Sequence, residues 1–354
     1  MLECITHKIL ADSPTTQAYL VCWQESQDLL DRFRTTFAHN PNVRIMSRAD
    51  VCLHFGVKDD EDNRDKALSA LCRRMKEEER RTGLPHCLLV DELPPQTGDW
   101  QSSCDWRQVD TRSLRLVLSI QPTAASSSSL TLVPPHGLTL LTLERVFRCT
   151  QRILLLLTHI IQHMATSGPI NYGKTSFPLG QATPGHEITG DMPEVLLLPP
   201  CSCVLCSTPL VCTYQRHWPS MLALLTRLHR EGVEARHTVL MLDLSDQEAE
   251  CLAWVEGELA GQSGLMGVRV KTPRQFRGCE AEVVVWCGRG WYSSSTALDT
   301  CTRATSRLFL ISQPSGVSND FHEVVAAACR AGRAIEAREQ AGLTGSSGAI
   351  ASAS

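Results

Sequence analysis

The chain has 354 residues, of which 43% are hydrophobic, and its 34 basic and 38 acidic residues give a net charge of −4. This length supports one large core or two medium ones, and about two domains are expected. The near balance of charge excludes a global field that would draw the chain to nucleic acid or anionic lipid, so any such contact must come from a local groove.

The 16 cysteines are scattered through strand-like, helix-like and loop-like segments. The opening residues Met1 to Cys4 carry an early acid and lack the features of a secretory leader. Reduced thiols and an intracellular location, nucleus or cytoplasm, are therefore expected. The longest apolar run, 153–161, is far shorter than the roughly 20 residues that span a bilayer, so no membrane contact is expected.

The first part of the chain alternates strand and helix patterns. Apolar runs predict strands at 18–23, 42–47, 87–92 and 114–120, while helical spacing of apolar residues predicts helices at 26–37 and 66–81. The wholly charged end of the second helix is interpreted as a solvated face. This alternation predicts an α/β fold with a parallel sheet covered by helices on both faces.

Regular strand and helix patterns resume after a middle stretch with little periodicity. A long helix is expected from 143 to about 164, followed by a stretch rich in Gly, Pro and Thr up to residue 200. A second series then predicts helices at 220–232, 246–261 and from 297, and strands at 237–244, 268–272, 281–288 and 307–312. The expected domains are an incomplete lobe (1–142, acidic motif at 88–94), a linking helix and irregular connection (143–200), a second lobe (201–335) and a disordered tail (336–354).

Two adjacent carboxylates, Asp91 and Glu92, close the apolar run at 87–92. The carboxyl ends of parallel strands form the usual ligand edge of an open α/β sheet. There Asp91 could hold Mg²⁺, and Glu92 could orient or deprotonate an attacking water. The alternative is that the Asp-Glu pair opens a turn or caps a helix.

Four stretches in a fixed order resemble motifs of superfamily 1 helicases of the UvrD-like and Schlafen-like kind. They are Val90-Asp91-Glu92, LERVFRCTQRI at 143–153, VRVKTPRQFRGCEAEVVVW at 268–286 and LDTCTRATSRLFLI at 298–311. The resemblance covers roughly Ala18 to Ser312. It implies two lobes of the RecA-like P-loop NTPase fold, ATP with Mg²⁺ as cofactors and single-stranded DNA or RNA as a partner.

The resemblance also gives single residues a role. It implies that Arg148 reaches the terminal phosphate, that Glu280 meets the nucleotide sugar after a tight turn at Gly278, and that Arg303 neutralises charge on the transferring phosphoryl group. Gln121 takes the place of a γ-phosphate sensor. Without the resemblance, Arg148 is an exposed helix arginine, Gly278 a loop glycine and Gln121 a turn residue before Pro122.

The chain departs from the family at the phosphate-gripping loop, because no Walker A motif precedes the acidic motif. GPINYGKT at 168–175 satisfies the letters of that motif and includes Lys174, but it follows a helix pattern and precedes Pro178, so we interpret it as coincidence. Either a longer chain supplies the front end or it has been lost. A lobe without its first strand would expose a sheet edge, which predicts a covering protein partner.

A cysteine cluster lies in PPCSCVLCSTPLVC. Cys201, Cys203, Cys206 and Cys212 could converge on Zn²⁺, with His217 as a substitute ligand. Reduced structural thiols on buried strands are the alternative. His186 and Glu187 do not complete a metalloprotease motif, since Gly190 stands where the second histidine belongs.

Three functions follow from these patterns. The first is a degenerate helicase-like module that binds nucleic acid or protein. The second is an active ATP-dependent helicase, if a longer chain or partner supplies the missing loop. The third is a zinc-stabilised scaffold. The 5% aromatic content offers few rings for base stacking.

Overall fold

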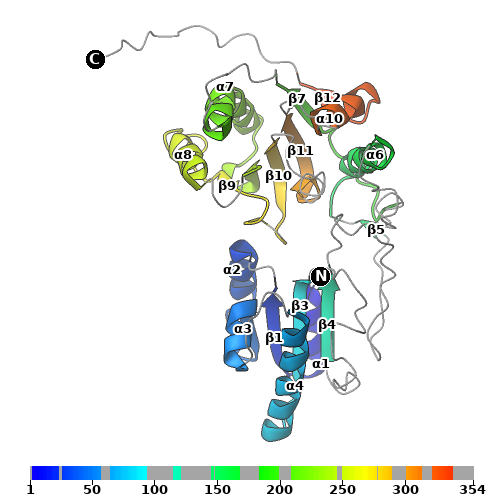
Figure 1. The fold of residues 1–354 in the computed structure, drawn as a ribbon, viewed down its shortest axis with the longest axis vertical. Coiled ribbons are helices and arrows are strands. Elements are labelled where there is room, and N and C mark those ends of the chain that lie inside the picture. Colours follow the sequence, from blue (N-terminus) through cyan, green and yellow to red (C-terminus); the bar gives the residue numbers. More distant parts are fainter. Residues whose placement is uncertain are drawn as a thin grey trace, which may run out of the picture. The chain divides into compact units, whose positions relative to one another are not determined.

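The structure is a computed structural model, and it describes residues 2–23, 26–56, 64–93, 115–120, 145–146, 148–167, 183–198, 209–244, 249–276, 278–288, 300–312 and 321–337. The chain divides into two compact units, each with its own sheet (Figure 1). Unit 1 comprises Met1–Val146, Ala165–Gly185 and Lys271–Glu280, and unit 2 comprises Phe147–Met164, His186–Val270 and Ala281–Ser354.

Unit 1 is built on a four-stranded sheet in the order β2-β1-β3-β4. Its strands are β1 (Gln17–Cys22), β2 (Val43–Ser47), β3 (His86–Leu93) and β4 (Arg115–Ile120), and all neighbours run parallel. Its helices are α1 (Leu2–Asp12), α2 (Gln27–Thr36), α3 (Arg48–His54) and α4 (Arg64–Thr82). A short parallel pair, β5 (Arg145–Val146) with β6 (Thr183–Pro184), lies outside that sheet.

The central strands of unit 1 form because their sequences are apolar on both faces. Five of the six residues of β1 are buried, as are the first five of β3. Strands covered on both faces have continuous apolar runs rather than an alternating pattern. This is why the predicted strands at 18–23 and 87–92 are confirmed within a residue at their first ends.

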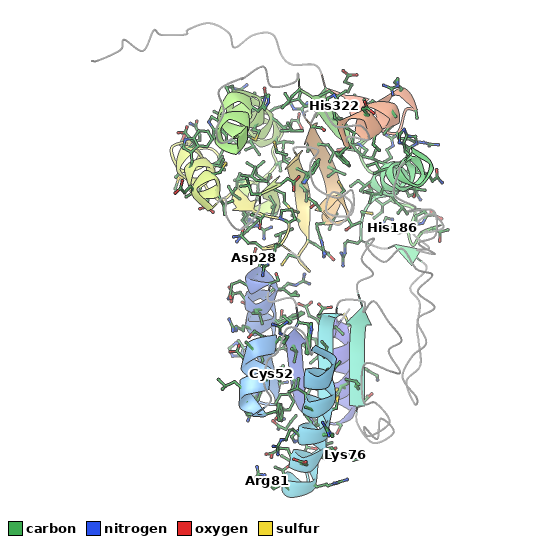
Figure 2. All side chains as sticks on the ribbon, viewed as in Figure 1. Asp28, Cys52, Lys76, Arg81, His186 and His322 are labelled. Atoms are coloured by element: carbon green, nitrogen blue, oxygen red, sulfur yellow. The ribbon has the colours of Figure 1, made fainter. Side chains whose placement is uncertain are left out.

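One face of this sheet is covered by a stripe along α4. Leu68, Leu71, Cys72 and Met75 are buried at the three- and four-residue spacing of a helix and pack with Val51 of α3 in one core. No residue from Lys76 to Thr82 is buried. The predicted solvated face of this helix is thereby confirmed, and Figure 2 labels Lys76 and Arg81 along it.

Unit 2 holds a six-stranded sheet in the order β12-β7-β11-β10-β8-β9. The strands are β7 (Glu194–Leu197), β8 (Thr238–Leu242), β9 (Arg269–Lys271), β10 (Ala281–Gly288), β11 (Ala304–Ser312) and β12 (Ile335–Glu336). The helices are α6 (Gln151–Ser167), α7 (Pro209–Arg230), α8 (Ala249–Ala260) and α10 (Phe321–Arg330), with a 3₁₀ turn at Ala235–His237. Strands β8, β10 and β11 supply the centre of its core.

Some expected elements differ from those observed. The helix expected from 143 begins at Gln151, because Arg145–Val146 pairs as β5 with β6 instead. The stretch up to residue 200, expected to be irregular, contains β7, whose four residues pair with β11 and whose first two also pair with β12. Cys212 lies in helix α7, so the strand alternative for that cysteine is wrong.

The α/β class with parallel sheets flanked by helices is confirmed in both units. Among the described ranges, no helix is both long and apolar enough to cross a membrane. Among the described residues, Cys4 and Cys72 of unit 1 and Cys329 of unit 2 form no disulfide.

Candidate functional site

The carboxyl ends of β1 and β3 lie side by side in unit 1. Cys22 is in register with Asp91, and the Trp23 N–H donates to the Asp91 carbonyl over 3.2 Å. The side chain of Asp91 belongs to a partly exposed residue. Asp91 thus lies near the carboxyl end of β3, whereas the Glu92 side chain lies outside the described residues.

Helix α2 begins at the same edge, directly after β1. Ser26 is its N-cap, and the buried Ser26 Oγ accepts a hydrogen bond from the Leu29 N–H over 3.4 Å. Asp28 stands in the first turn, where a carboxylate is favoured by the helix dipole. Figure 2 labels Asp28 on this helix.

The segment between β9 and β10 carries Gly278 and Glu280 and belongs to unit 1. Its first turn is closed reciprocally, because the Thr272 N–H donates to Gln275 Oε1 (3.0 Å) and the Gln275 N–H donates to Thr272 Oγ1 (3.2 Å). The fully buried Phe276 donates its N–H to the Thr272 carbonyl over 3.1 Å. Gly278 has a φ of +77°, a backbone conformation that other residues adopt only with strain. The predicted tight turn at Gly278 is thus observed.

Two contacts hold this segment against the first turn of α2. Ser26 Oγ donates to the Gln275 carbonyl over 3.3 Å. Lys271 Nζ lies 2.9 Å from Asp28 Oδ1, with side-chain exposures of only 27% and 21%. An ion pair this sheltered from water is screened less than a surface pair. These contacts hold the start of the segment that leads to Gly278 and Glu280 against α2, within the same unit as Asp91.

Arg32 lies one turn after Asp28 in α2 and adds a second positive charge to that of Lys271. Its guanidinium donates to both carboxylate oxygens of Glu3 in α1, each over 2.9 Å. These hydrogen bonds are the main reason why the pKa of Arg32 is raised; burial acts against them, and the charges of Glu3 and Glu280 add to the rise. Glu280, which is half-buried, therefore lies within the electrostatic reach of Arg32.

Arg303 is buried in unit 2, immediately before β11. Its N–H donates to the Thr300 carbonyl over 3.1 Å, and its own carbonyl accepts from the Ala281 N–H over 3.0 Å. Ala281 follows Glu280 in the chain and opens β10, in register with Ala304. The two motifs that contain Glu280 and Arg303 are thus joined through the backbone at the amino ends of β10 and β11.

Of the other expected site residues, the structure describes the surroundings of Arg148. Arg148 is exposed, in a bend before α6 rather than inside a helix. Gln121, Lys174, Cys201, Cys203 and Cys206 lie outside the described residues, as does the side chain of Cys212. In the part of the chain that is described, no three His, Cys, Asp or Glu side chains are grouped as metal ligands. His186 makes local turn contacts, accepting at Nδ1 from the Ile188 N–H.

Ser26, Asp28 and Lys271 were missed by motif reasoning. A serine followed by an acid in the first helical turn is a recognisable N-cap signal, so Ser26 could have been found. The pairing of Asp28 with Lys271 has no local signal, because the two residues are 243 positions apart.

No family model matches the chain, and no curated protein matches it. Among solved structures, it is similar to the C-terminal domain of a possible DNA helicase from Lactobacillus plantarum. The match has 16% identity, covers 48% of this chain and 88% of that one, and has a TM-score of 0.29, so the similarity is distant.

Proposed function

We propose that this chain is a helicase-derived binding module that holds single-stranded nucleic acid or a protein partner and does not hydrolyse ATP on its own. The observation that supports this most directly lies in unit 1. There Asp91 pairs with the end of β1, just before α2, and Lys271 and Gln275, which lead to Gly278 and Glu280, contact the first turn of α2. Site residues gathered at the carboxyl ends of parallel strands are typical of ligand binding in α/β folds.

In this proposal the site keeps a residual contact with ATP and Mg²⁺. In unit 1, Asp91 would hold the metal, with Glu92 beside the attacking water, and Glu280 would accept a hydrogen bond from the nucleotide sugar. In unit 2, the resemblance to helicases gives the phosphate contacts to Arg303 and Arg148. Turnover is not expected, because the chain has no Walker A loop before Asp91 to grip the phosphates.

Nucleic acid would bind through a local surface, because the net charge of −4 provides no general attraction. A few phosphate contacts would still make the affinity fall as salt rises, with a slope of roughly −0.7 per contact for a single strand. A reducing nuclear or cytoplasmic location is in keeping with free cysteines in both units.

The test uses the full chain. Labelled single-stranded DNA and RNA are titrated with it by anisotropy at two salt concentrations. ATP and a non-hydrolysable analogue are titrated with Mg²⁺, and phosphate release is measured with and without the strands. The variants are Glu280→Gln, Arg303→Lys and Lys174→Ala, with Glu256→Gln on the exposed face of α8 as a matched control.

Strand binding without phosphate release supports the proposal. Phosphate release that is lost in Arg303→Lys and kept in Glu256→Gln would favour an active helicase instead. Loss of phosphate release in Lys174→Ala would show that residues 168–175 take part in hydrolysis. If neither strand nor nucleotide binds, the nucleic-acid form of the proposal fails and only a protein-binding module remains. A stoichiometric metal content in the purified chain would then favour the zinc-stabilised scaffold.

A further inference from the structure

His86 is the first residue of β3, at the opposite end of that strand from Asp91. It is 3% exposed, and neither ring nitrogen has a hydrogen-bond partner within the part of the chain that the structure describes. Its ring centroid lies 5.6 Å from that of Tyr19 in β1. A buried imidazole without a hydrogen-bond partner is an unusual feature, since buried polar groups are nearly always paired.

Tyr19 is the centre of the packing around His86. Phe55, just after α3, lies 5.3 Å from the Tyr19 ring, and the Arg44 guanidinium lies over that ring at 5.8 Å. Arg44 Nη1 is 3.2 Å from Nε2 of His54 in α3. Since a guanidinium can only donate, this contact requires a free lone pair on His54 Nε2.

The charges that act on His86 come from two elements and oppose one another. Burial is the main reason why the pKa of His86 is lowered, and Arg44 in β2 lowers it further. Glu79 and Glu78 in α4 act in the opposite direction without overcoming the burial. Arg81 donates hydrogen bonds to Glu78 from the next turn of α4, so one of the two carboxylates is already partly engaged.

We propose that His86 is an acid-responsive switch for the amino end of the first sheet. On taking up a proton, its ring leaves Tyr19 and turns toward Glu78 and Glu79, which loosens the last turns of α4 from β3. An imidazolium held in the apolar site would lack both water and an acceptor, which is costly. Repulsion from Arg44 and attraction to the two glutamates set the direction of the movement.

The sign of the pH dependence follows from linkage. Below the ordinary histidine pKa of about 6.5, the unfolded chain binds a proton that folded His86 does not. The contribution of neutral His86 to the free energy of unfolding is therefore fully present above about pH 6.5 and is lost as the pH drops below it. The equilibrium constant for folding should decrease by up to about tenfold per pH unit, until folded His86 also titrates.

Two measurements on the full chain test this switch. Histidine ring resonances are followed by NMR from pH 8 to pH 5, with His86 assigned by its loss in His86→Phe. Hydrogen–deuterium exchange of peptides from 64–82 is measured at pH 7.5 and 5.5 and corrected for the intrinsic rate. We expect His86 to titrate below 6.5 and the protection of 64–82 to fall in acid, whereas peptides of α8 stay unchanged.

The variants separate a switch from a structural role. His86→Phe keeps a ring against Tyr19 and should abolish the acid response, while the exposed His39→Gln should keep it. Changing both glutamates, Glu78→Gln with Glu79→Gln, should move the His86 titration to lower pH. Titration of His86 at or above 6.5 overturns the proposal, as does acid-independent protection of 64–82. If His86→Phe does not fold, the change in protection of 64–82 between pH 7.5 and pH 5.5 in the unmodified chain still tests the proposal.

Discussion

Lys271 and Asp28 form an ion pair with Nζ 2.9 Å from Oδ1, although they are 243 residues apart in the sequence. Lys271 ends β9 and Asp28 lies in the first turn of α2. The pair therefore fixes the beginning of the segment that leads to Gly278 and Glu280. The conformation of the segment therefore depends on this anchor and on the contact of Ser26 with Gln275.

Removal of the Lys271 charge should weaken this anchor. Lys271→Met is expected to lower the free energy of unfolding by about 1 kcal/mol, the upper range for pairs that keep some contact with water. The exchanged pair Lys271→Asp with Asp28→Lys should regain part of the loss. Lys8→Met removes a far more exposed pair with Asp12 and should change little, and urea unfolding compares all three. Equal losses for Lys271→Met and Lys8→Met would argue against the anchor.

Ser26 has two tasks, and a comparison with Ser47 separates them. Ser26 caps α2 and also donates to the Gln275 carbonyl, whereas Ser47 only caps α3 through a capping box with Asp50. Ser47→Ala should cost about 1 kcal/mol, as lost caps do. Ser26→Ala should cost more and should also speed proteolysis within 272–280. Cleavage there at the rate of the unchanged chain would mean that the Ser26 contact does not hold the segment.

Gly278→Ala should destabilise the chain because the residue has a φ of +77°. The cost of placing a side chain in that conformation is about 1–2 kcal/mol. Gly257→Ala is the matched control, since Gly257 lies inside α8 with open space around a Cβ, and it should stabilise by up to about 1 kcal/mol. Thermal unfolding of both variants measures the difference in sign. The same sign for both would contradict the role given to the turn at Gly278.

Phe309 is the centre of a charged network in unit 2. Its buried ring lies 5.1 Å from the Arg307 guanidinium and 5.7 Å from that of Arg227. Phe309→Ala should cost about 3–5 kcal/mol through the cavity and the lost contacts. Met266→Ala, at a side chain that is 72% exposed, should be nearly neutral in the same urea titration. A loss below 1 kcal/mol for Phe309→Ala would show that this part of the core can collapse around the gap.

Thiol labelling should distinguish buried from exposed cysteines. Burial raises the pKa of the Cys72 thiol to about 12, so the reactive thiolate is rare at neutral pH. Cys4 is exposed. Iodoacetamide should modify Cys4 in the folded chain and Cys72 only after unfolding, as read from peptide masses, and Cys4→Ser removes the early product. Early labelling of Cys72 would indicate that α4 opens readily.

The sequence predicts the central strands well because buried parallel strands have long apolar runs. Helices α1, α3 and α10 were missed. In α1 the buried residues are Leu2, Thr6 and Leu10, so a polar threonine interrupts the apolar stripe. Strand β7 has only four residues, and its place is decided by pairing with β11 and β12 rather than by its own pattern.

Within the candidate site, residues with a local sequence signal were predicted and residues that depend on distant contacts were not. Asp91 and Gly278 were located by motifs, since a strand end and a tight turn have local signatures. The Glu3–Arg32 and Lys271–Asp28 pairs were not found, because side chains that meet across many residues leave no periodic trace. The cause is physical, since tertiary packing chooses these partners only after the strands and helices have formed.

The division of the chain into three stretches per unit limits how it can be taken apart. No single cut of the polypeptide releases either unit whole. A chain ending at residue 185 keeps the first sheet but leaves Asp28 without Lys271 and Ser26 without Gln275. A chain beginning at residue 186 keeps both of those partners, with nothing of α2 for them to bind. Terminal truncations would therefore remove function from both halves, whichever unit carries it. Excision of 272–280, bridged by a short glycine linker, would instead test the contribution of that segment alone.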